Sequence, residues 1–167
     1  TMTSIGPGSM NVATGLGTAF VDSIPLISFT GGPQTYMLGR GVLQELERQQ
    51  DNVFPHIIQP MVKRNWDVQH VNLLADVLPR AFNTMLSGRP GPVHIELPMD
   101  VQAEVTDLPV PDPAGRRATS GAVRPDPDAI DQAAAKLLAA KRPVLLAGGG
   151  CLEAEAAAEV KKVAEYL

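Results

Sequence analysis

The sequence predicts an α/β fold, with parallel sheets flanked by helices in two incomplete three-layer α/β domains. Short apolar runs alternate along the chain with segments of helical periodicity. Glycine-rich turns close these runs, as at 31–33 and 148–150. Short links from strand to helix to strand imply parallel pairing through right-handed crossovers. A proline-rich stretch interrupts the series, so residues 1–100 and 128–167 form the two domains and 101–127 the linker.

The first domain opens on the tail of a strand at 1–5, which leads into the turn Gly6-Pro7-Gly8. Glycine permits positive φ there and lets another molecule approach the backbone, while Pro7 makes the turn stiff. We expect Ser9 to cap a helix over 11–22, whose apolar positions recur at helical spacing. The apolar run 25–30 then predicts a buried strand.

The pattern is less regular in the middle of this domain. A helix is expected over 41–50, followed by a segment with one apolar face between Pro55 and Pro60. The basic pair Lys63-Arg64 beside the single tryptophan has two interpretations. It is either a solvated surface or a contact for an anion or a flavin.

The first domain ends with a helix and a strand. A single apolar stripe predicts a helix over 72–86, which is kinked at Pro79 or effectively starts near Asp76. Residues 93–98 predict the next strand. His94 lies inside that strand, so we interpret it as a hydrogen-bonded structural histidine rather than a catalytic one.

The second domain repeats the same plan. An alanine-rich helix is predicted over 128–140, a strand over 143–147, a triple-glycine turn at 148–150 and a helix over 152–167. The first strand is only a tail and the last helix has no stop signal. A sheet cut at both edges would expose unpaired strands, so we expect the chain to be a piece of a longer protein.

Composition narrows the class of protein. The 167 residues are 44% hydrophobic and 19% charged, which is ordinary for a globular protein. A net charge of −4 gives no electrostatic reason to expect a nucleic-acid partner, and no apolar run could span a membrane. The single cysteine, Cys151, fits a reducing cytoplasm.

A series of short motifs occurs in a fixed order along the chain. It comprises Ile-Gly-Pro-Gly-Ser-Met-Asn at 5–11, Asp-Ser-Ile-Pro-Leu at 22–26, Thr-Gly at 30–31, Leu-Gln-Glu at 43–45, Lys-Arg-Asn at 63–65, Ser-Gly-Arg-Pro-Gly-Pro-Val at 87–93 and Leu-Pro-Met-Asp at 97–100. The series resembles the thiamine-diphosphate-dependent enzymes of the acetolactate synthase group. Arg-Pro-Val-Leu-Leu-Ala-Gly-Gly-Gly at 142–150 resembles the start of their central domain.

The resemblance implies a domain assignment. Residues 1–100 would be the C-terminal part of the pyrimidine-binding domain, and 128–167 the start of a central domain that resembles FAD- or NAD-binding domains. The activating glutamate would lie upstream of Thr1, and the ligands of Mg²⁺ downstream of Leu167. We name no catalytic residue and no metal ligand within the chain.

The resemblance also implies contacts with cofactors. Pro7 and Asn11 match positions near the aminopyrimidine ring of thiamine diphosphate, Gln44 matches an active-site glutamine, and Ser4 stands where the family has Thr or Ser. Arg89 and the turn formed by Gly148, Gly149 and Gly150 match positions that contact FAD in flavin-containing members. These residues, Ser4, Pro7, Asn11, Gln44, Arg89, Gly148, Gly149 and Gly150, are the candidate cofactor-binding set.

The activity implied is decarboxylation of a 2-oxo acid such as pyruvate and transfer of the resulting enamine to a second carbonyl. A homodimer or homotetramer and a role in branched-chain amino acid biosynthesis would accompany it. Met99 replaces a lysine common in acetolactate synthases, and the interval from Gln44 to Lys63 is longer than usual, so another carboligase or decarboxylase stays open. On this interpretation the fragment is inactive alone.

Two other interpretations stay open. The first is a non-catalytic assembly partner or degenerate paralogue, in which the faces bearing Leu16, Phe20 and Met37 would be interfaces. The second is a nucleotide-binding domain of the NAD type. Its Gly-x-Gly-x-x-Gly pattern is missing from the first turn, and no acidic residue follows at the appropriate strand end.

Overall fold

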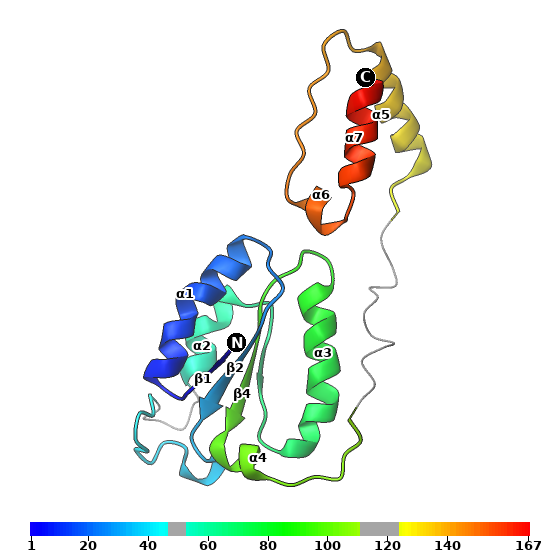
Figure 1. The fold of residues 1–167 in the computed structure, drawn as a ribbon. Helices are drawn as coiled ribbons and strands as arrows, with labels where there is room; N and C mark the ends of the chain where they lie inside the picture. The colour runs from blue at the N-terminus through cyan, green and yellow to red at the C-terminus, as the bar shows by residue number, and fades with distance from the viewer. Residues whose placement is uncertain (47–52, 111–123) are drawn as a thin grey trace. The chain divides into compact units, whose positions relative to one another are not determined.

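The chain forms two compact units, Thr1–Ser120 and Gly121–Leu167. The computed structural model describes residues 1–46, 53–110 and 124–167. Figure 1 traces the helices and strands of both units, and each unit is treated by itself below. The assignment of residues 1–100 and 128–167 to two named domains, with 101–127 as their linker, stays a prediction.

The first unit is built on a parallel sheet of four strands in the order β1-β2-β4-β3. The strands are β1 (Met2–Thr3), β2 (Ile27–Gly32), β3 (Asn65–Asp67) and β4 (Val93–Pro98). Central strands β2 and β4 pair over their full length, from Ile27 opposite Val93 to Gly32 opposite Pro98. All carboxyl ends therefore lie at one edge of the sheet, as the α/β prediction requires.

Helices cover both faces of this sheet (Figure 1), so the unit has three layers. On one side lie α1 (Pro7–Val21) and α2 (Val53–Ile58), which meet in a cluster that includes Leu16, Phe54 and Ile58. On the other side lies α3 (Leu74–Leu86). Its apolar stripe packs on residues such as Val93 and Ile95. Apolar burial on both sides is the main force that holds the layers together.

The two faces of the sheet differ in chemistry. The face toward α3 carries the apolar residues of β2 and β4, which alternate with polar ones. The opposite face carries the polar residues Ser28, Thr30, His94 and Glu96, and all four are buried. The ring of Phe54 in α2 meets the ring of His94 edge-on, with centroids 5.4 Å apart, which places this polar face under α2.

Short elements fill the connections of the first unit. They are the 3₁₀ turns η1 (Thr35–Met37), η2 (Gln59–Met61) and η3 (Val71–Leu73), and the short helix α4 (Met99–Ala103). Helix α3 begins at Leu74, directly after η3, and includes Pro79 in its interior. The expected start near Asp76 is therefore too late by two residues. Beyond α4, residues 104–110 form no helix or strand.

The expected helix over 41–50 differs from the structure where it is described. Residues 41–46 form a turn, and the remainder lies outside the described residues. Gly41 and Gln44 both have positive φ, at 77° and 67°, which no right-handed helix accommodates. Strand β3 was not predicted from the sequence, because its three residues have mixed polarity and show no strand period.

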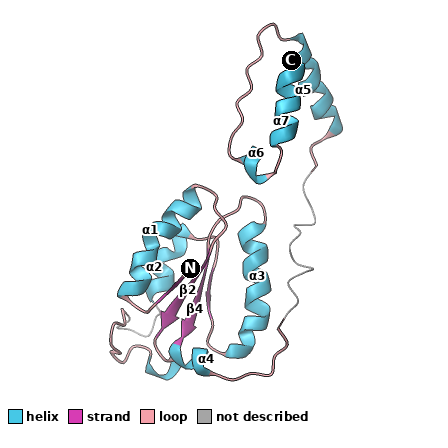
Figure 2. Cartoon of the chain, viewed as in Figure 1, coloured by secondary structure: helices cyan, strands magenta, loops and turns pink. Residues whose placement is uncertain are grey.

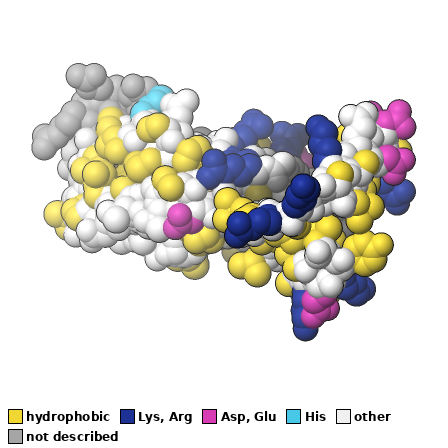
Figure 3. Space-filling model, turned by 90° about the horizontal axis from the view of Figure 1, so that it is seen from above, with side chains coloured by type: hydrophobic (Ala, Val, Ile, Leu, Met, Phe, Trp, Pro, Cys, Tyr) yellow, Lys and Arg dark blue, Asp and Glu magenta, His cyan; other side chains and the backbone are white. Residues whose placement is uncertain are grey.

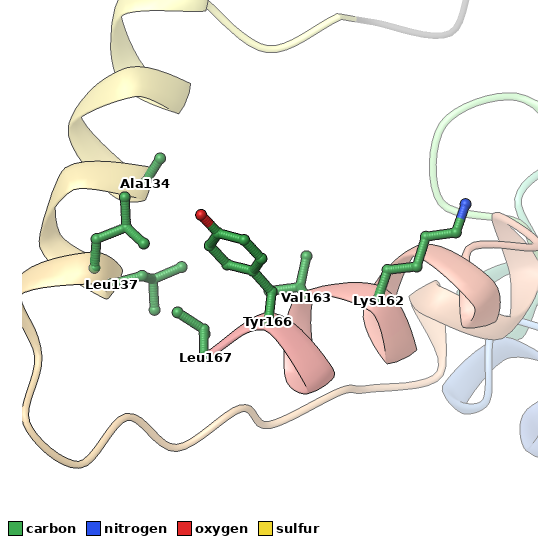
Figure 4. Close-up of a pocket in the computed structure, with 7 residues that line it drawn as sticks. Ala134, Leu137, Lys162, Val163, Tyr166 and Leu167 are labelled. Atoms are coloured by element: carbon green, nitrogen blue, oxygen red, sulfur yellow. The ribbon is translucent and has the colours of Figure 1, made fainter.

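The second unit consists of α5 (Pro127–Ala139), α6 (Gly150–Glu153) and α7 (Ala157–Tyr166), as Figure 2 shows. Asp126 caps α5, because its side chain accepts a hydrogen bond from the backbone N–H of Asp128. A pocket of about 420 Å³ lies between α5 and α7, and Figure 4 draws the residues that line it. Its lining is mainly apolar and includes Leu137, Val163 and Tyr166.

Two predictions for the second unit were wrong. Residues 143–147 form no strand, because a strand needs a hydrogen-bonded neighbour and the described part of this unit, 124–167, contains no other strand. Val144 and Leu146 are consequently 89% and 97% exposed. The helix expected over 152–167 is interrupted after α6, where Glu155 takes a φ of 53°.

Large hydrophobic side chains are exposed in both units. Phe20 and Phe82 are examples in the first unit, and Leu146 and Tyr166 in the second. Figure 3 shows hydrophobic side chains at the surface of the molecule. Within the described ranges, no helix is both long and apolar enough to cross a bilayer.

Candidate functional site at the carboxyl edge of the sheet

The candidate site is organised by the turn that joins β1 to α1. Gly6 has a φ of 61° and precedes Pro7, the first residue of α1. Ser9 does not cap this helix as expected. It lies inside the first turn, and its hydroxyl donates to the backbone oxygen of Ser4 at 2.8 Å. This bond holds the strand end against the helix start and so fixes the position of Ser4.

A second loop, in the connection between β2 and α2, meets this turn. The carboxylate of Glu45 accepts hydrogen bonds from the backbone N–H groups of Gly39 at 2.8 Å and Val42 at 2.9 Å. These bonds close the loop and present Gln44 with positive φ. The backbone carbonyl of Gln44 then lies against Gly6, in space that any Cβ on residue 6 would need.

Ser4, Pro7 and Gln44 border the Gly6 turn at the carboxyl edge, and Asn11 lies one turn further along α1. Pro7 and Asn11 are four residues apart on α1, so they lie on the same side of that helix, and both are exposed. Ser4 and Gln44 border the same turn and are exposed as well. The arrangement offers amide and hydroxyl groups around a glycine turn at the edge where ligands of parallel sheets bind.

Comparison with known proteins finds related sequences. Residues 1–52 match the family described as thiamine pyrophosphate enzyme, N-terminal TPP binding domain. The chain is 38% identical over 164 residues to the acetolactate synthase isozyme 1 large subunit of Escherichia coli, which covers 98% of this chain and 27% of that protein. It is 35% identical over 165 residues to a probable acetolactate synthase large subunit of Methanococcus aeolicus, covering 97% of this chain and 26% of that protein.

By sequence, this chain belongs to the acetolactate synthase group of thiamine-diphosphate-dependent enzymes. The glyoxylate carboligase of Escherichia coli is also similar, with 36% identity over 168 residues that cover 96% of this chain and 26% of that protein. The chain spans about a quarter of the length of the curated relatives it matches. Its membership of the acetolactate synthase group agrees with the all-parallel sheet of the first unit.

In this member of the acetolactate synthase group, Arg89 lies away from the other predicted site residues. It precedes β4, at the amino-terminal edge of the sheet. Its Nε donates to the Ser23 hydroxyl and its Nη2 to the Val21 carbonyl, both at 2.6 Å. These bonds tie the loop before β4 to the C-terminal end of α1. Two of the five guanidinium N–H groups are used here, so others face solvent.

The predicted glycine turn of the second unit is exposed. Gly148, Gly149 and Gly150 lead into α6, and an added Cβ on any of them would meet no atom within 4 Å. Packing within this unit therefore gives no reason for three glycines. A flavin contact at this turn stays a prediction. In the described residues no group of three or more His, Cys, Asp or Glu side chains could hold a metal ion.

The basic pair has two different environments. Lys63 Nζ donates to the backbone oxygens of Ser87 at 2.6 Å and Arg89 at 2.9 Å, and burial lowers the pKa of its amine. Arg64 lies over the ring of Trp66, 5.2 Å from the centroid. Lys63 is thus a structural anchor for the loop that carries Arg89. The interpretation of the pair as an anion or flavin contact stays a prediction.

Glu96 is an acidic residue near the site that the sequence pattern did not single out. It is 3% exposed at the end of β4 and lines a small cavity together with Gly6, Glu45 and Phe54. Its Oε1 lies 2.6 Å from where a Cβ on Gly32 would stand. Gly32 and Glu96 are far apart in the sequence, so no local sequence pattern indicates this contact.

Thr35 and Asp100 join the loop after β2 to helix α4. The Asp100 carboxylate accepts from the Thr35 hydroxyl at 2.6 Å and from its backbone N–H at 3.1 Å. Burial alone would raise the pKa of Asp100, but these bonds and backbone N–H groups of α4 outweigh it and hold the pKa below its usual value. Asp100 is therefore ionised at neutral pH and fixes the loop.

His94 is a buried structural histidine, as the sequence predicted. It is fully buried, and its Nε2 lies 2.8 Å from the Thr30 hydroxyl. Burial disfavours the charged ring and lowers the pKa of His94 to about 4. The ring is therefore neutral at physiological pH.

Proposed function

We propose that the protein in which this chain occurs is a thiamine-diphosphate-dependent carboligase or decarboxylase that acts on 2-oxo acids, as acetolactate synthase does. The observation that carries the proposal is the contact of Gln44 with the Gly6–Pro7 turn. This contact assembles residues separated by more than thirty positions at one sheet edge. The similarity to acetolactate synthase large subunits and to glyoxylate carboligase supports the same reaction class.

The residues at this edge fit an aminopyrimidine ring. In the proposed complex, Pro7 supplies an apolar ring surface, and the Asn11 and Gln44 amides supply hydrogen-bond donors and acceptors. Ser4 and Gly6 shape the floor of the turn. When bound, thiamine diphosphate supplies the nucleophilic carbon and the electron sink for decarboxylation. The protein contributes position and exclusion of water.

The remaining contacts extend the proposal to further cofactors. The free N–H groups of Arg89 and the open turn at Gly148, Gly149 and Gly150 would contact FAD. Ligands for Mg²⁺ would come from outside residues 1–167. On this proposal, residues 1–100 are part of the pyrimidine-binding domain, 101–127 the linker and 128–167 the start of the central domain.

The proposed biological setting follows from the acetolactate synthase group. Pyruvate is the first candidate substrate, and the protein would be a cytoplasmic homodimer or homotetramer. Branched-chain amino acid biosynthesis would be its role if the product is acetolactate. The replacement of the usual lysine by Met99 is the reason to test acceptors other than pyruvate as well.

The test is to incubate the purified protein with thiamine diphosphate, Mg²⁺ and pyruvate, and to measure release of carbon dioxide and formation of acetolactate. We expect Asn11→Ala to weaken thiamine diphosphate binding about tenfold, since one hydrogen bond is lost. Thr14→Ala, an exposed change on the same helix, is the matched control. Residues 1–167 alone should release no carbon dioxide above background.

A protein that neither binds thiamine diphosphate nor consumes any 2-oxo acid would overturn the proposal. The sequence preceding Thr1 provides a separate check. A glutamate at the activating position agrees with catalysis, whereas another residue there would favour the assembly partner.

A further inference from the structure

A row of polar side chains crosses the sheet beneath α2. Ser28 in β2, His94 in β4 and Asn65 in β3 are register partners, so their side chains lie on the same face of three adjacent strands. Ser28 and His94 are both fully buried. Phe54 covers the His94 ring from above the sheet.

Each member of this row has one polar atom without a partner among the described residues. These atoms are Ser28 Oγ, His94 Nδ1 and Asn65 Oδ1. The other polar atom of each ring or amide is engaged. His94 Nε2 bonds to the Thr30 hydroxyl, and Asn65 Nδ2 donates to the Pro55 carbonyl at 2.9 Å. Three neighbouring buried atoms that lack partners would be costly, because such groups are nearly always satisfied by protein or by ordered water.

We propose that Ser28, His94 and Asn65 form an internal water-binding site, in which ordered water bridges His94 Nδ1 to Ser28 Oγ and Asn65 Oδ1. Water suits this site because a water molecule both donates and accepts hydrogen bonds. Each of the three groups still lacks either a donor or an acceptor as its partner. The Ser28 hydroxyl can do either, and Asn65 Oδ1 accepts. Water therefore satisfies the row whichever nitrogen of the neutral His94 ring carries the proton.

The surroundings agree with water rather than a larger or charged ligand. The row is sealed from solvent at Ser28 and His94, which excludes anything bulky. The ring is neutral, since burial lowers its pKa to about 4. Access comes from the Asn65 side, where Asn65 and Val62 also line a surface pocket of about 370 Å³. Water can therefore enter from this pocket as the protein folds.

The direct test is a crystal structure of the purified protein at a resolution that shows ordered water. We expect density within about 2.7–3.2 Å of His94 Nδ1 and of at least one of Ser28 Oγ and Asn65 Oδ1. A ring turned so that Nδ1 meets Thr30, or Ser28 Oγ bonded to a protein carbonyl, with no water density in the row, would overturn the proposal.

A second test uses native-state hydrogen exchange of the β4 amide groups. Ser28→Ala removes one partner of the bound water, so we expect these amides to exchange about tenfold faster. If Ser28 Oγ had no partner at all, removing it would leave exchange unchanged or slow it, and that result would contradict the proposal. Thr18→Ala, an exposed change on α1, should leave β4 exchange unaltered. If Ser28→Ala does not fold, the crystal structure decides.

Discussion

The backbone carbonyl of Gln44 occupies the space that a Cβ atom on Gly6 would need. This contact links two segments that are distant in sequence, and it depends on positive φ at both residues. The candidate cofactor site is therefore held by backbone shape as much as by its side chains. Its most sensitive position is a glycine without any functional group.

Gly6→Ala should undo this contact. The new methyl group clashes with the Gln44 carbonyl, and a φ of 61° is unfavourable for alanine. We expect a loss of about 1–3 kcal/mol in the free energy of unfolding. Gly15→Ala is the matched control, because its Cβ would meet no atom within 4 Å and alanine favours a helix. Chemical denaturation of both variants measures the difference, and equal stabilities would refute the argument.

Glu45→Ala should release the loop that presents Gln44. Its carboxylate holds the backbone N–H groups of Gly39 and Val42, and ionised acceptors make the stronger hydrogen bonds. We expect the two amide groups to exchange hydrogen at least tenfold faster, and thiamine diphosphate to bind more weakly. Glu45→Gln keeps one acceptor oxygen, so an intermediate effect is expected. If exchange at Gly39 and Val42 does not change, the carboxylate does not hold the loop.

The stability of the first unit should fall in mild acid because of His94. Its pKa is about 4 in the fold against 6.5 in the unfolded chain, so the unfolded state binds more protons between these values. The neutral His94 ring contributes about 3 kcal/mol at most to the free energy of unfolding. This contribution is complete above pH 6.5 and is lost as the pH falls towards 4. Denaturation at several pH values measures this slope. His94→Gln, which cannot titrate, should have a shallower slope, and an identical slope would exclude His94 as the cause.

Lys63→Met should loosen the loop that precedes β4. The ammonium group bridges the backbone oxygens of Ser87 and Arg89, and methionine retains most of the apolar stem without the donor. We expect a loss of about 1 kcal/mol, modest because both bonds are exposed to solvent. Lys63→Arg keeps a cation and should recover part of the loss. A thermal unfolding midpoint equal to the wild-type value would show that the bridge adds no stability.

Strong periodic patterns in the sequence predicted the main elements of the first unit. Residues 93–98 were predicted as a strand, and β4 has these bounds. The predicted helix over 11–22 corresponds to α1, which starts earlier because Pro7 fits the first helical position. The second unit was less predictable at 143–147. An apolar run indicates a strand, but hydrogen bonds from a neighbour are what make it one.

The candidate site was predictable only in part. The motif residues at 4–11 and Gln44 could be named from their resemblance to a family, but their meeting depends on backbone angles at Gly6 and Gln44. Arg89 lies at the opposite edge of the sheet because it precedes β4. The direction of β4 is known only from its parallel pairing with β2. Alternation of apolar and polar residues in β2 and β4 is typical of sheets with one solvated face. Here the polar face is buried as well, in agreement with the buried strand that the apolar run at 25–30 predicts.

The polar row on the sheet also has a consequence for how the strands find one another. A shift of β4 by one residue would place Ile95 opposite Ser28 and turn His94 into the apolar layer beneath α3. Such a misaligned sheet would bury an imidazole among aliphatic side chains, away from the Thr30 hydroxyl. Ser28, His94 and Asn65 thus favour the native register of the three strands, because any other pairing is energetically unfavourable while the chain folds.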